Sequence, residues 1–176
     1  MDRNFIKKNN ITKGNFISKM YFNFNYFIVE NICNFNNKNV LDFGGGLGFL
    51  KKRLIQKGAN VKIYDKVKEL SDVNNYKDYD CDIVIFSHVL IYINKYEVEK
   101  IFSFFKKKNK KILIISWFSN QTIFNKIFAF LLGHKNPHKD TVLLPQTEEQ
   151  LISNFFKIEK SINFFLFKVI LSSTKN

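Results

Sequence analysis

Residues 40–50 read VLDFGGGLGFL, an apolar burst that ends in glycines and leads into a segment with helical spacing. Residues 40–43 predict a buried strand, and residues 48–57 predict a helix that Gly58 closes. Glycines at the turn between a strand and a helix permit positive φ angles and let a ligand lie against bare main chain. This stretch therefore predicts the first strand, ligand-approach loop and helix of an α/β domain.

Strands and helices continue to alternate after this unit. The predicted elements are strands at 60–65, 81–87 and 112–117 and helices at 97–105 and 147–155. Strands separated by helices imply right-handed crossovers and a parallel sheet. The last helix, capped by Thr147, precedes two strands at 157–164 and 165–172 that are close enough to form a hairpin. The expected fold is α/β, Rossmann-like and doubly wound, with a mostly parallel sheet and a C-terminal antiparallel hairpin.

A chain of 176 residues fits one domain with one sizeable core. We expect residues 1–37 to form an N-terminal helical cover and residues 38–176 to form the Rossmann-like core. Over 16–34, apolar residues recur at spacings of three and four, which is typical of an amphipathic helix. They are Ile17, Met20, Tyr21, Phe24, Phe27, Ile28 and Ile32.

The glycine loop is compatible with more than one kind of site. A dinucleotide-binding G-x-G-x-x-G pattern counted from Gly44 places Phe49 at its third glycine, where a ring would obstruct the pyrophosphate. The carboxylate of Asp42 would also repel a pyrophosphate, whereas it suits a ligand with an ammonium and a sulfonium. A purely structural glycine turn remains open. Asp65 ends the second predicted strand, where a carboxylate can accept hydrogen bonds from both ribose hydroxyls.

The spacing D-x-G-x-G-x-G from Asp42 to Gly48, together with Asp65 and the segment YDCDIVIFSHVLIYI at 79–93, resembles class I S-adenosylmethionine-dependent methyltransferases. The likeness covers about residues 38–118 and points to the small-molecule, type-11/23-like branch. It implies S-adenosylmethionine as the cofactor. The implied cofactor-binding residues are Asp42, Gly44, Gly45, Gly46, Gly48, Asp65, Lys66, Ser87 and His88.

Two departures from the family pattern matter. The connection between Asp65 and the strand near Ile83 is short, so we expect the third strand to be short or missing. Adenine contacts are then left to the nearest candidates, Asn74, Asn75 and Tyr76. The fourth-strand segment ends in SHVL rather than N/D-P-P-Y, which argues against the amino-methyltransferases of DNA adenine.

Methyl transfer from a sulfonium requires alignment of the acceptor and exclusion of water, and it needs a base only when the acceptor loses a proton. His88 is the first candidate for positioning or general base, because we expect a neutral imidazole to titrate near working pH. A purely structural role for this histidine is an equal alternative.

Tyr92 is a further candidate, because it stands where the family often has histidine. His138 is another, because it lies with His134 in a loop expected over the same edge of the sheet as His88. Residues 123–132 carry an apolar stripe, which we interpret first as part of the core. If the stripe is exposed, it would suit a lipid-like or aromatic acceptor or docking on a membrane.

The formal net charge is +13, and the excess lies in lysine rather than arginine. The densest lysine run, 106–111, is interpreted as a solvated helix end beside the negative pole of the helix dipole. Cys33 and Cys81 stand apart from each other and from histidines, which argues against zinc and a disulfide framework. The sequence shows no signal peptide or transmembrane segment, so a cytoplasmic protein without a metal is expected.

The leading functional hypothesis is a methyltransferase for a small-molecule or lipid-like acceptor. RNA methylation is one alternative and is favoured by the basic charge. A regulatory protein that binds the cofactor without catalysis is another alternative. Nucleic acid is therefore a possible but not a favoured partner. The acceptor atom, the pathway and the oligomeric state are left open by the sequence.

Overall fold

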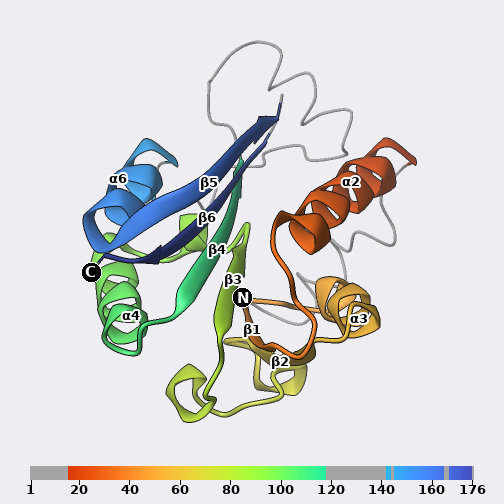
Figure 1. Cartoon of the computed structure of the whole chain (residues 1–176), viewed down its shortest axis with the longest axis horizontal. Coiled ribbons are helices and arrows are strands. Elements are labelled where there is room, and N and C mark those ends of the chain that lie inside the picture. Colours follow the sequence, from red (N-terminus) through yellow and green to blue (C-terminus); the bar gives the residue numbers. More distant parts are fainter. Residues whose placement is uncertain (1–15, 118–141, 144, 165–166, 176) are drawn as a thin grey trace.

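One mixed sheet forms the centre of the molecule in the computed structural model, which describes residues 16–117, 142–143, 145–164 and 167–175. Its six strands follow the order β2-β1-β3-β4-β6-β5 (Figure 1). The strands are β1 Asn39–Phe43, β2 Asn60–Tyr64, β3 Ile83–Ser87, β4 Lys111–Trp117, β5 Phe156–Phe164 and β6 Phe167–Thr174. The first four pair in parallel, and β6 runs antiparallel to both β4 and β5. The structure confirms the doubly wound, mostly parallel sheet with a C-terminal hairpin.

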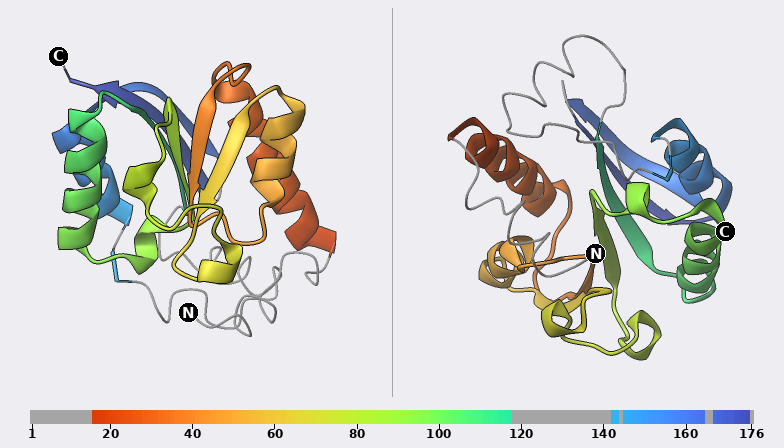
Figure 2. Two further views of the ribbon diagram at one scale, coloured as in Figure 1. Left: turned by 90° about the horizontal axis from the view of Figure 1, so that it is seen from below. Right: turned by 180° about the vertical axis from the view of Figure 1, so that it is seen from behind.

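Helices cover both faces of this sheet. In Figures 1 and 2, α2 (Phe16–Ile32) and α3 (Phe49–Gln56) lie on one side, and α4 (Lys95–Lys107) and α6 (Pro145–Phe155) lie on the other. Alternate residues of a strand point to opposite faces. Ile83 and Ile85 of β3 accordingly join the core under α2 and α3, while Val84 and Phe86 join the core under α4 and α6. Burial on both faces explains why this strand is a continuous apolar run.

Two helices differ in detail from the expectation. In α2 the buried line is Tyr21, Asn25, Val29 and Ile32, whereas Met20 and Phe27 are more than half exposed. The helix is apolar around most of its circumference, so spacing alone did not identify the face that packs. The last helix begins at Pro145 rather than after Thr147, because proline fits the first turn, where its missing N–H needs no partner.

The connection from β2 to β3 contains no strand in the part of the chain that the structure describes. It holds two short 3₁₀ turns, η2 Lys68–Leu70 and η3 Tyr76–Asp78. The ring of Tyr76 packs 5.4 Å from both Phe43 and Tyr64, measured between ring centroids. The expectation of a short or missing third strand is therefore confirmed, and an aromatic cluster stands beside the edge of the sheet.

None of the helices described here combines the length and the apolar character that a membrane crossing requires.

Candidate functional site

The glycine loop lies at the carboxyl end of β1, where ligands bind in open α/β sheets. Gly44, Gly46 and Gly48 have φ angles of 75°, 52° and 72°, a conformation that side-chain-bearing residues rarely adopt. The Gly44 N–H donates to the carbonyl of Tyr64 at 2.7 Å, which ties the loop to β2. The loop is thus held in place by backbone hydrogen bonding.

The glycines differ in what surrounds them. A Cβ at Gly44 would lie 2.4 Å from Cγ2 of Val89, and a Cβ at Gly45 would lie 2.5 Å from a carboxylate oxygen of Asp42. A Cβ at Gly46 would meet no atom of the described residues within 4 Å. Gly44 and Gly45 therefore allow close packing within the fold, whereas Gly46 faces a space that none of the described residues occupies and that a ligand can enter.

Asp42 lies beneath the loop with only 1% of its surface exposed. Its two carboxylate oxygens have no hydrogen-bond partner among the residues that the structure describes. Burial, reinforced by the charge of Asp65 and partly offset by Lys51, raises the pKa of Asp42 to about 7. A buried carboxyl of this kind is stabilised by a cationic ligand.

Asp65 follows β2 and turns toward the glycine loop. One carboxylate oxygen accepts the N–H of Gly46 at 3.1 Å, and the other accepts the N–H of Val67 at 2.9 Å. The acid at the end of the second strand and the open part of the loop are thus directly joined. Lys66, the next residue, is exposed.

His88 follows β3 in a left-handed conformation, with φ of 54°, and its N–H donates to the carbonyl of Ile115 at 2.9 Å. Its imidazole centroid lies 6.4 Å from the ring of Tyr21 and 6.2 Å from that of Phe22, both on α2. The residue is half-buried, but both ring nitrogens are buried, and burial lowers the pKa of His88 to about 4. The expectation that this imidazole titrates near neutral pH is therefore wrong, because its buried ring takes up a proton only well below pH 7.

Among the described residues, the others predicted for the site lie on several different elements and not on the glycine loop itself. Ser87 is half-buried at the end of β3, and Tyr92, in the turn η4 Leu90–Tyr92, is 41% exposed. Asn75 uses its side-chain oxygen to accept the N–H of Lys77, and Asn74 is exposed. His134, His138 and the stripe at 123–132 lie outside the described residues.

Sequence reasoning missed Glu148, in the first turn of α6. Only 2% of its surface is exposed, and burial raises its pKa to about 7 although a hydrogen bond from Ser116 lowers it. Ser116 stands one residue before the end of β4, so this carboxyl lies near the same edge of the sheet as the glycine loop. From the sequence alone, an acid in the first turn of a helix indicates only a favourable interaction with the helix dipole.

Within the described ranges, no cluster of histidine, cysteine and acidic residues could hold a metal ion. Cys33 is half-buried and Cys81 is buried, and both are free thiols.

No protein-family model and no curated protein matches the sequence. Solved structures do match the fold. The pyocyanin biosynthetic protein PhzM is 12% identical with a TM-score of 0.69, over 90% of this chain and 56% of that chain. Magnesium protoporphyrin IX methyltransferase (ChlM) from Synechocystis PCC 6803 with bound SAM is 16% identical with a TM-score of 0.62, over 99% and 92%. A SAM-dependent methyltransferase from Archaeoglobus fulgidus is 13% identical with a TM-score of 0.64, over 98% and 100%.

The present chain thus spans little more than half of PhzM and nearly all of the other two proteins. At these identities the likeness establishes the Rossmann-like fold of the chain.

Proposed function

We propose that this protein binds S-adenosylmethionine at its glycine loop and transfers the methyl group to a small-molecule or lipid-like acceptor. The observation that carries the proposal is the convergence of the open backbone at Gly46 with the carboxyls of Asp42 and Asp65. The similarity in fold to SAM-dependent methyltransferases supports the same function.

The residues present fit this cofactor. A buried carboxyl without a partner among the described residues, Asp42, suits the ammonium of the methionine part. Asp65 already accepts backbone N–H groups, and its remaining lone pairs can accept ribose hydroxyls. The loop from Gly44 to Gly48 offers main chain without side chains. When bound, the cofactor supplies a methyl group activated by the sulfonium charge.

The protein's own task is to position the acceptor and exclude water. The neutral ring of His88, enclosed by Tyr21 and Phe22 of α2, is suited to orient an acceptor hydroxyl or amine. Glu148, with its pKa near 7, is suited to take up a proton at neutral pH. Ser87 and Lys66 are proposed as further contacts to the cofactor, and Tyr92 and His138 as contacts to the acceptor.

Isothermal titration calorimetry of the full chain tests the cofactor step. We expect S-adenosylmethionine and S-adenosylhomocysteine both to bind, and Asp65→Ala to weaken each of them at least tenfold. The exposed Asp78, converted to Ala, is the matched control and should leave both affinities unchanged. Absence of heat with either ligand in the wild-type protein would refute the proposal.

A tritiated-methyl assay on small-molecule, lipid and RNA fractions tests the acceptor. Label in the small-molecule or lipid fraction is the expected result. Label confined to the RNA fraction would mean that the acceptor is RNA and not a small molecule or lipid. Cofactor binding without label in any fraction would indicate a regulatory protein that binds the cofactor.

A further inference from the structure

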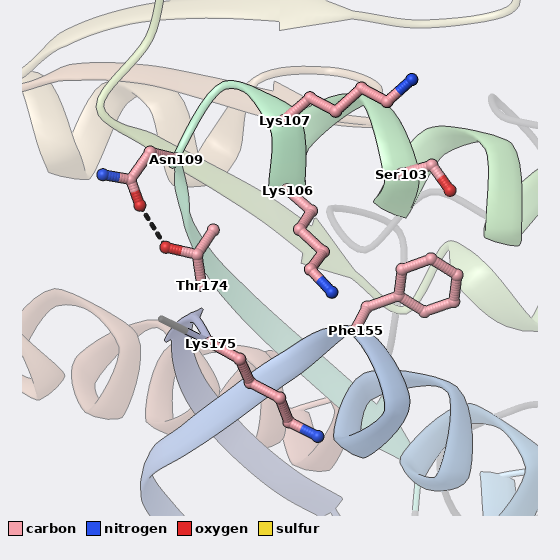
Figure 3. Close-up of a pocket in the computed structure, with 7 residues that line it drawn as sticks. All are labelled: Ser103, Lys106, Lys107, Asn109, Phe155, Thr174 and Lys175. Carbon is pink, nitrogen blue, oxygen red and sulfur yellow. Dashed lines mark hydrogen bonds between the residues drawn. The ribbon is translucent and has the colours of Figure 1, made fainter.

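Two adjoining hollows run along α4. One, about 640 Å³ in volume, is lined by Lys106 and Phe155 among others (Figure 3), and the second, about 600 Å³, by Tyr96 and Phe104 among others. Ser103 and Lys107 line both hollows, so the two form one continuous surface, here called the α4 groove. In Figure 3, Lys106 extends from α4 toward α6, and the ring of Phe155 extends from α6 toward α4.

The α4 groove carries a surplus of positive charge. Its lining includes five lysines and one acid, Glu99, which itself lies 3.9 Å from Lys95. The five are Lys77, Lys100, Lys106, Lys107 and Lys175. In the described part of the chain none of these five takes part in an ion pair, whereas Lys110 pairs with Asp80 and Lys111 with Glu159. Within the lysine run, Lys110 and Lys111 are thus paired, whereas Lys106 and Lys107 are not and line a concavity, where a positive potential is concentrated.

Aromatic rings alternate with these ammonium groups. Tyr96 is 65% exposed, and the Lys100 ammonium lies 4.1 Å from its ring centroid. Lys77 lies 5.7 Å from the ring centroid of Tyr76 and 5.9 Å from that of Phe104. Flat apolar rings beside unneutralised cations suit a ligand that combines phosphates with planar bases.

The length of the groove indicates whether it suits a single nucleotide or a strand of several nucleotides. The 13 residues of α4 extend about 20 Å, which exceeds one nucleotide and accommodates several in succession. A bilayer surface fits less well, because apart from Tyr96 the most exposed apolar side chains of the described helices, Phe16, Met20 and Phe27, lie on α2, across the sheet.

We propose that the α4 groove binds single-stranded nucleic acid, with the lysines on its phosphates and Tyr96 and Phe104 stacked on its bases. The groove begins at the end of α4 that follows η4 and ends where α4 turns into β4, at the opposite edge of the sheet. The lysines at its far end, Lys106, Lys107 and Lys175, lie away from the glycine loop, whereas Tyr76 at its near end packs against Phe43 and Tyr64 beside that loop.

Fluorescence anisotropy of the full chain with a labelled single-stranded 12-mer, as RNA and as DNA, tests the proposal. The groove variant is Lys106→Gln/Lys107→Gln/Lys175→Gln. The control variant is Lys52→Gln/Lys57→Gln/Lys62→Gln, which removes the same charge from exposed positions on α3, its C-cap and β2. We expect the groove variant to lose at least tenfold in affinity and its log–log salt slope to become shallower by about 2. The control should lose less than threefold, and the RNA and DNA arms identify the preferred strand.

Tyr96→Ala tests stacking separately from charge. We expect a loss of roughly fivefold or more with an unchanged salt slope, since stacking releases no counterions. Phe27→Ala, an exposed aromatic on α2, should leave binding unchanged. Equal losses in the two lysine variants would overturn the proposal, as would binding to phosphatidylglycerol vesicles without binding to either oligonucleotide. An unchanged far-ultraviolet circular dichroism spectrum of the groove variant would establish that the protein remains folded.

Discussion

Single glycines in the loop should separate folding from ligand binding. Gly44 has a φ of 75° and lies against Val89, whereas Gly46 has a φ of 52° and faces open space. A left-handed conformation costs a side-chain-bearing residue about 1–2 kcal/mol, and overpacking adds about 1–3 kcal/mol. We expect Gly44→Ala to destabilise the protein by about 2–5 kcal/mol and Gly46→Ala by about 1–2 kcal/mol, measured by urea denaturation.

Cofactor affinity should rank the two variants in the opposite order. Among the folded molecules, Gly46→Ala should bind the cofactor more weakly than Gly44→Ala. A methyl group at position 46 enters the space proposed for the ligand. Gly46→Ala should therefore cost far more free energy of S-adenosylmethionine binding than free energy of unfolding. Unchanged affinity in this variant would place the ligand elsewhere.

The buried carboxyl of Asp42 should make the stability of the free protein depend on pH. Its pKa rises from 3.8 when exposed to about 7 in the fold, so the folded state retains a proton that the unfolded state has lost. Stability therefore falls as pH rises between about 4 and 7, and the full cost is present above pH 7. The difference corresponds to a free energy on the order of 4 kcal/mol.

Asp42→Asn removes this titration. We expect its stability relative to wild type to increase between pH 4 and pH 8 in denaturant titrations, on top of a pH-independent cost for burying an amide without a partner. Asp78→Asn, at an exposed position, should show no such trend. A parallel pH dependence in Asp42→Asn and wild type would contradict the burial of this charge.

At the scale of elements, the local pattern predicted β1 to β4 because each apolar run is bounded on at least one side by a glycine, an acid or a lysine. In α4, Val98, Ile101, Phe102 and Phe105 recur at helical spacing, and all four are buried. Burial of Glu148 could not be predicted, because it depends on where α6 packs against the end of β4, far away in the sequence. The pKa of His88 also depends on long-range packing, since α2 supplies the rings that surround it.

The aromatic cluster at the β2–β3 connection should replace the packing that a further strand would provide. Tyr76 lies 5.4–5.7 Å, between ring centroids, from Phe43, Tyr64, Phe104 and Phe105. Because ring packing and not the hydroxyl makes these contacts, Tyr76→Ala should destabilise the protein by about 2–3 kcal/mol and Tyr76→Phe by less than about 0.5 kcal/mol. Chemical denaturation measures both. Similar losses in the two variants would assign the effect to the hydroxyl instead.

At the scale of the whole molecule, two electrostatic effects of salt oppose each other. The described residues form six ion pairs, mostly at the surface, and salt weakens each of these by a fraction of a kcal/mol. The formal net charge of +13 meanwhile repels itself across the folded chain, and salt screens this repulsion. The unpaired lysines of the α4 groove add to the repulsion at short range.

We expect the repulsion to dominate, because the excess charge exceeds what the ion pairs neutralise. The midpoint of thermal unfolding should therefore rise between 20 and 300 mM potassium chloride and level off as the screening length falls to about 6 Å. The groove variant, with three fewer charges concentrated at one surface, should melt higher than wild type at 20 mM and gain less from salt. The control variant should gain less from salt by a smaller margin, since its lysines are spread over α3, its C-cap and β2. A melting temperature that falls steadily with potassium chloride would mean that the ion pairs outweigh the net charge.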